Sequence, residues 1–84
     1  MAGNGRFPSM KAKRLRAILE RKPLSYRVVR QSGPHRRLRS PSHPPITFAI
    51  HDGATVSPGR VRKILVDQVG LTANEARKLL LRGI

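Results

Sequence analysis

The sequence predicts an α+β domain of two layers, in which a three-stranded antiparallel sheet is covered on one face by helices. Two observations predict the layers. Apolar residues recur at helical spacing towards both ends of the chain, and three short segments between them alternate or are rich in β-branched residues. A third observation, turns containing glycine or proline between these segments, makes neighbouring strands antiparallel. With 84 residues and no cysteine, we expect one small domain without disulfides.

The first expected element is an amphipathic helix that starts after Pro8-Ser9 and ends before Pro23. Ser9 is its candidate N-cap, because a serine hydroxyl can accept a hydrogen bond from the first turn of a helix. Apolar residues at helical spacing form the inward face: Ala12, Leu15, Ile18 and Leu19. Residues 1–8 lack this periodicity, so we expect a disordered N-terminal extension over 1–8 and a single domain over 9–84.

The three expected strands follow this helix. The first covers residues 26–31, and the Ser32-Gly33-Pro34 turn leads into a short, very basic second strand over residues 35–39. A proline-rich loop then precedes a third strand over residues 46–51, whose alternation places Ile46, Phe48 and Ile50 on one face. Since only one face of such a sheet is covered, the arginines are expected on the other, solvent-exposed face.

Two further helices complete the chain. Ser57 is the expected cap of the first, Pro58 occupies its first position, and Gly70 ends it. Thr72-Ala73-Asn74-Glu75 has the pattern of a capping box and opens a short C-terminal helix with Ala76, Leu79 and Leu80 inward. The resulting order, α-β-β-β-α plus a short C-terminal helix, is the topology of the double-stranded-RNA-binding fold.

Composition indicates the kind of partner. The net charge is +14, with 18 Lys and Arg against four acidic residues, and Arg outnumbers Lys by 13 to 5. This favours a polyanion bound through phosphates, or an acidic protein that covers the charge. The four carboxylates are far apart in sequence and the histidines lack the spacing of metal ligands, so we expect neither a metal nor another cofactor. No transmembrane span or signal peptide is evident, and we expect a cytoplasmic protein.

The candidate site is the stretch Arg30-Gln31-Ser32-Gly33-Pro34-His35-Arg36-Arg37-Leu38-Arg39. Histidine can take and give a proton near neutral pH, and arginine matches phosphate oxygens with its planar fork. RNA supplies its own nucleophile, the 2′-hydroxyl, so a protein needs only proton transfer and charge stabilisation to cut it. His35 is therefore the candidate catalytic residue. A histidine in such a stretch is more often a solvated hairpin residue than a catalyst.

Strand parity indicates which of these side chains share a face. Leu38 should face the core, which sends Arg37 and Arg39 to the open face together with His35, and leaves Arg36 nearer the strand edge. Each arginine could also be a solvated strand residue. The candidate RNA-binding residues are Gly33, Arg30, Arg36, Arg37 and Arg39.

The chain resembles the HicA family of toxins, also called YcfA-like, from bacterial type II toxin–antitoxin systems. The resemblance spans about residues 10–76. It rests on a basic N-terminal helix, Arg30-Gln31-x-Gly33-x-His35, a third strand closing on His51, Ser57-Pro58-Gly59-Arg60-Val61-Arg62-Lys63-Ile64-Leu65, and Gly70-Leu71-Thr72 with Glu75.

The resemblance implies an mRNA interferase, that is, an endoribonuclease that cuts mRNA, neutralised by an antitoxin, HicB. It assigns catalysis to the histidine of the Gly-x-His motif, here His35. The family usually has Ser or Thr between the two residues. Pro34 stands there in this chain and removes a hydroxyl and a backbone N–H from a point where phosphate could be bound.

Two alternatives to the enzyme remain at this point. One is a non-catalytic RNA-binding module on the same fold. Pro34 and the presence of a single well-placed histidine are the features that keep this alternative open. The other is a small structural protein of a ribonucleoprotein particle, which the charge alone fits. His51 is a candidate second proton handler, although a surface residue at a strand end is the commoner case. The few aromatic residues, of which Phe48 belongs to the expected core, predict recognition of RNA by backbone and shape.

Overall fold

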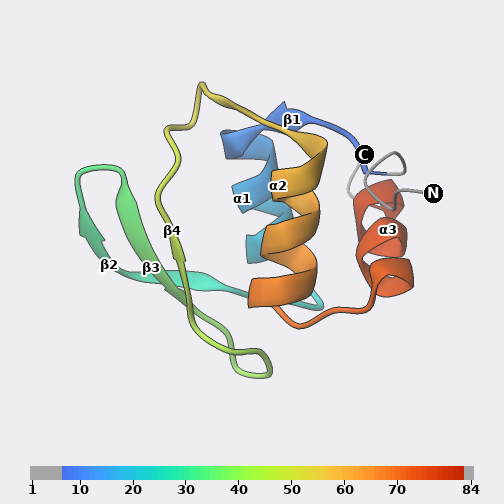
Figure 1. Cartoon of the computed structure of the whole chain (residues 1–84). Helices are drawn as coiled ribbons and strands as arrows, with labels where there is room; N and C mark the ends of the chain where they lie inside the picture. The colour runs from blue at the N-terminus through green and yellow to red at the C-terminus, as the bar shows by residue number, and fades with distance from the viewer. Residues whose placement is uncertain (1–6, 83–84) are drawn as a thin grey trace.

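A computed structural model of the chain describes residues 7–82 and confirms the α+β class (Figure 1). The expected disorder of residues 1–6 lies outside the described residues. The elements in chain order are β1 (Met10–Lys11), α1 (Ala12–Glu20), β2 (Arg27–Ser32), β3 (His35–Arg39), β4 (Ile46–Phe48), β5 (Thr55–Val56), α2 (Pro58–Arg62), η2 (Lys63–Gln68) and α3 (Ala73–Arg82).

The three-stranded sheet has the order β2-β3-β4, and both neighbouring pairs are antiparallel. Helices α1 and α2 lie side by side next to this sheet, and α3 lies beyond them, on the side away from the sheet (Figure 1). Leu38, Ile46 and Phe48 point from the sheet into the core between the layers and are at most 3 % exposed. The predicted two-layer arrangement is thus confirmed.

A second, two-stranded sheet was not predicted. β1 pairs antiparallel with β5, with Met10 opposite Val56, and brings the start of α1 against the loop after β4. The backbone N–H groups of Ala12 and Lys13 donate to the carbonyl oxygens of Ala54 and Asp52, at 2.9 and 3.2 Å. The prediction that Ser9 caps this helix is wrong, because backbone carbonyls from a distant loop satisfy its first turn.

The later helix signals are confirmed. The Ser57 hydroxyl accepts from the backbone N–H of Arg60, and Thr72 and Glu75 exchange both hydrogen bonds of a capping box. α2 continues directly into η2, which widens to π-type turns and ends before Gly70, whose φ is +93°. The predicted short C-terminal helix is α3, which has ten residues.

The core extends further towards the N-terminus than predicted. Phe7 is 3 % exposed and belongs to the main cluster of buried side chains, so the packed domain includes residues before the expected start at Ser9. Tyr26 and Phe48 are also buried, and the Tyr26 hydroxyl donates to the carbonyl oxygen of Pro44 at 2.7 Å. All three aromatic side chains of the sequence therefore pack in the core.

No helix within residues 7–82 has both the length and the apolar character to cross a bilayer.

Candidate functional site

The β2–β3 hairpin positions His35. Ser32 pairs with His35, which leaves Gly33 and Pro34 as a two-residue loop. Gly33 has a φ of +60°, as the first position of such a hairpin turn requires, and proline suits the second because its ring fixes φ at about −65°. The bond that closes a two-residue loop uses the N–H of the residue after it, so Pro34 removes no hydrogen bond from the hairpin. His35 thus begins β3 directly after the turn.

Residues that pair directly across an antiparallel sheet present their side chains to the same face. Three pairs in the hairpin, Arg27 with Arg39, Arg30 with Arg37 and Ser32 with His35, therefore share one face, and the pairing of Arg37 with Thr47 adds β4 to it. We call this surface the His35 face, and it comprises Arg27, Arg30, Ser32, His35, Arg37, Arg39 and Thr47. All seven are exposed. The predicted placement of His35, Arg37 and Arg39 on one open face is confirmed.

A β-bulge adds Arg27 to this face, and sequence reasoning missed it. The register shifts between Val28 and Arg30, so Val29 is an extra residue in β2. Arg27 and Arg30 are three residues apart and would point to opposite faces of a regular strand. The bulge places both on the same face as His35. The signal in the sequence was the Val28-Val29 pair, which breaks the alternation; the two side chains are 38 % and 48 % exposed.

The His35 face is strongly basic. Arg37 Nη1 donates to Thr47 Oγ1 at 3.1 Å, which holds this guanidinium over the sheet two residues from His35 along the strand. Within residues 7–82 the three salt bridges join Arg16 and Arg36 to Glu20 and Asp52, and none of them includes a residue of the His35 face. The positive charge of its four arginines is therefore available to a ligand.

Arg36 lies on the other side of β3, apart from the other predicted arginines. It pairs with Phe48, and its Nη1 lies 3.3 Å from Asp52 Oδ1. Asp52 Oδ2 also accepts a hydrogen bond from Arg16 Nη2 at 3.1 Å. This bond, with the attraction of the nearby cations, lowers the pKa of the Asp52 carboxyl. We call Arg16, Arg36 and Asp52 the Asp52 junction, because it ties α1, β3 and the loop after β4 together.

The other two histidines lie outside the His35 face. His43 is in the loop before β4, where Nδ1 lies 2.9 Å from Ser42 Oγ. His51 was expected at the end of the third strand, but β4 ends at Phe48 and His51 lies in the following loop. Within residues 7–82, no group of three His, Cys, Asp or Glu side chains is placed to hold a metal ion.

A comparison with known protein families gives the family of the chain. Residues 12–71 match the family model described as the HicA toxin of bacterial toxin–antitoxin, which is more than half of the 84 residues. The chain belongs to the HicA toxin family. No curated protein and no solved structure matches the chain.

Membership in the HicA family makes the chain a toxin of a toxin–antitoxin pair, with an antitoxin as its partner. The matched residues contain the whole His35 face and the Asp52 junction. They end at Leu71, before α3, and they begin at Ala12, after β1.

Proposed function

We propose that this HicA-family toxin is an endoribonuclease that cuts single-stranded mRNA in the cytoplasm by acid–base chemistry, with His35 as its catalytic residue. The observation that carries the proposal is the His35 face. One exposed histidine shares an open surface with four arginines, and none of the three salt bridges within residues 7–82 involves any of them. These are the two kinds of group that cleavage by the 2′-hydroxyl requires.

In the proposed reaction the 2′-oxygen forms a bond to the adjacent phosphorus as the bond from phosphorus to the 5′-oxygen breaks. The 2′-hydroxyl loses its proton to a base, and the 5′-oxygen gains a proton from an acid. The products are a 2′,3′-cyclic phosphate and a 5′-hydroxyl. One histidine performs one of these transfers in a given step, and water performs the other. Arg37, held by Thr47, is the candidate for stabilising the added negative charge at phosphorus.

Binding would rest on the backbone of the RNA. The four arginines of the His35 face can each contact a phosphate, and Gly33 leaves open space at the turn. The three aromatic side chains are buried, so bases cannot stack on them at this face. We propose that a HicB-like antitoxin inhibits by covering the same face. Arg36 contributes to folding in this proposal, because it belongs to the Asp52 junction.

The test is cleavage of a labelled single-stranded RNA by the full chain in the presence of EDTA. We expect cleavage to continue, with 2′,3′-cyclic phosphate ends, and to stop at a nucleotide whose 2′-hydroxyl is replaced by hydrogen. His35→Ala should lower the rate by about 10²–10⁴ and leave RNA affinity unchanged. His51→Ala is the matched control and should keep the rate, because His51 lies in the loop after β4.

Three results would contradict the proposal. Loss of activity on chelation would replace acid–base chemistry with metal chemistry. Full activity, or growth arrest on overexpression, in the His35→Ala variant would remove His35 as the catalyst. Tight RNA binding by the wild type without any cleavage would favour the non-catalytic RNA-binding module, for which the presence of Pro34 in the Gly-x-His motif is the supporting observation.

A further inference from the structure

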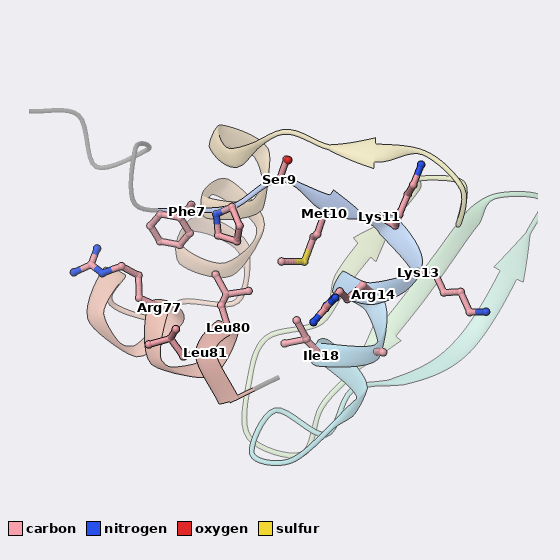
Figure 2. A pocket seen from close by; sticks show the side chains of 12 residues that line it. Phe7, Ser9, Met10, Lys11, Lys13, Arg14, Ile18, Arg77, Leu80 and Leu81 are labelled. Atoms are coloured by element: carbon pink, nitrogen blue, oxygen red, sulfur yellow. The ribbon is translucent and has the colours of Figure 1, made fainter. Parts of the chain in front are cut away.

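A groove of about 1120 Å³ lies between α1 and α3 (Figure 2). Three parts of the chain form it: the segment from Phe7 to Lys11, the outer face of α1, and the second half of α3. Figure 2 shows Met10, Ile18 and Leu80 around the space between the two helices. The groove shares no residue with the His35 face.

The groove has an apolar floor and a basic rim. Ile18 and Leu80 are buried at its base, whereas Ala17 and Leu81 are exposed, Leu81 to 72 %. Contiguous exposed apolar surface with a polar rim is typical of a surface that binds another protein. The cationic side chains that line the groove are Lys11, Lys13, Arg14 and Arg77, and no acidic residue lines it. None of these four takes part in a salt bridge within residues 7–82.

Two of the three parts that form the groove lie outside the range that matches the HicA family. That match begins at Ala12 and ends at Leu71, whereas Phe7 to Lys11 and the α3 residues Arg77, Leu80 and Leu81 fall beyond it at either end. Only the α1 face belongs to the matched range. The matched range therefore covers only one of the three parts that form the groove.

We propose that this groove binds an acidic, amphipathic segment of the antitoxin. The apolar side chains of such a segment would cover Leu81, Ala17 and Met10, and its carboxylates would meet the basic rim. RNA does not fit this chemistry, because phosphates gain nothing from an apolar floor. A second copy of the chain does not fit either, since each copy carries a net charge of +14.

The consequence is an antitoxin that holds the toxin at two places. Binding at the groove keeps the antitoxin on the toxin molecule, so that covering the His35 face becomes an intramolecular step for an antitoxin that reaches around the domain. RNA that competes for the His35 face would then displace only one of the two contacts. The inference rests on the antitoxin partner that family membership implies, and it does not depend on RNA cleavage.

The test compares two variants of α3 in the full chain, both with His35→Ala so that the toxin can be produced alone. Leu81→Glu places a carboxylate in the groove, and we expect it to weaken binding of the antitoxin encoded beside this toxin by about tenfold or more. Lys78→Glu is the control, because Lys78 is exposed on the same helix but does not line the groove. Its charge change is twice as large, so a general electrostatic effect would be stronger in the control.

Hydrogen exchange of the complex gives a second measurement that needs no variant, and we expect the antitoxin to protect the amides of α3. Equal antitoxin affinity of Leu81→Glu and Lys78→Glu, or exchange in α3 that the antitoxin leaves unchanged, would overturn the proposal. Self-association of the free toxin that Leu81→Glu abolishes would overturn it too, by showing that a second copy occupies the groove. RNA cleavage can fail or succeed independently of these results.

Discussion

Arg36 and Arg37 are neighbours in β3 and have the same charge, yet they belong to two different regions of the molecule. Arg37 stands on the His35 face, exposed and within hydrogen-bonding distance of a threonine hydroxyl. Arg36 points the other way into the Asp52 junction, where it meets a carboxylate that Arg16 also binds. One strand therefore supplies an exposed cation outside the salt bridges within residues 7–82 and a salt-bridged cation at successive positions.

The difference follows from how few carboxylates the chain has. Only four are available for 18 Lys and Arg side chains. Asp52 is placed where three elements meet, and there it forms salt bridges with two half-buried arginines and offsets part of their mutual repulsion. No salt bridge within residues 7–82 reaches the His35 face. The position of the acidic residues thus decides which cations stabilise the fold and which remain available to a polyanion.

The largest effect that separates the two sides of β3 is expected at Leu38, which lies between Arg37 and Arg39 and is fully buried. Leu38→Ala should lower the free energy of unfolding by about 2–5 kcal/mol, because it removes apolar contacts and leaves a cavity. Arg37→Ala, one position away, should change stability by less than about 0.5 kcal/mol. Urea unfolding of both variants checks this. Equal losses of unfolding free energy in Leu38→Ala and Arg37→Ala would mean that the His35 face contributes to the packing of the core.

A smaller effect is expected from the Asp52 junction, and it depends on pH. The pKa of Asp52 in the folded chain lies below its unfolded value, because Arg16 donates a hydrogen bond to it and the nearby cations attract it. Its contribution to stability is therefore present above about pH 4 and is lost as the pH falls through the folded value. Asp52→Asn should lower the melting temperature at pH 7 and flatten its fall towards pH 3.

Asp67→Asn is the matched control for this measurement, because Asp67 is exposed and takes part in none of the three salt bridges within residues 7–82. It should leave both the melting temperature and its pH dependence close to the wild type. Glu75 adds to the same acid sensitivity, since hydrogen bonds from Thr72 lower its pKa too. A melting temperature of Asp52→Asn equal to that of the wild type at pH 7 would show that the junction contributes nothing to stability.

The smallest expected effect is on RNA binding, and it distinguishes Arg36 from Arg37 and Arg39. Each phosphate contact on a single strand contributes about 0.7 log units of affinity per log unit of salt. Arg37→Ala and Arg39→Ala should each reduce the slope of affinity against salt by about this amount. Arg36→Ala should keep the slope and lower the melting temperature instead. An unchanged slope for Arg37→Ala and Arg39→Ala would place the RNA elsewhere, first of all on α1.

The sequence by itself determined the features that depend on near neighbours. Period-two alternation around Leu38 set His35, Arg37 and Arg39 on one face, and the hydrogen-bonding side chains of Ser57 and Thr72 set the starts of two helices. Each of these depends on atoms a few residues apart, so a local pattern is enough to predict it.

Only the tertiary structure decided the features that need distant groups to meet. The carbonyls of Asp52 and Ala54 replace the expected cap at Ser9, and the Asp52 carboxylate pairs with Arg36 on the side of β3 opposite the His35 face. The bulge at Val29 puts Arg27 on the face of His35, because strand β2 keeps its pairing with β3 on both sides of an extra residue. Each of these outcomes depends on which distant backbone or charge the chain encounters when it packs, and no local pattern carries that information.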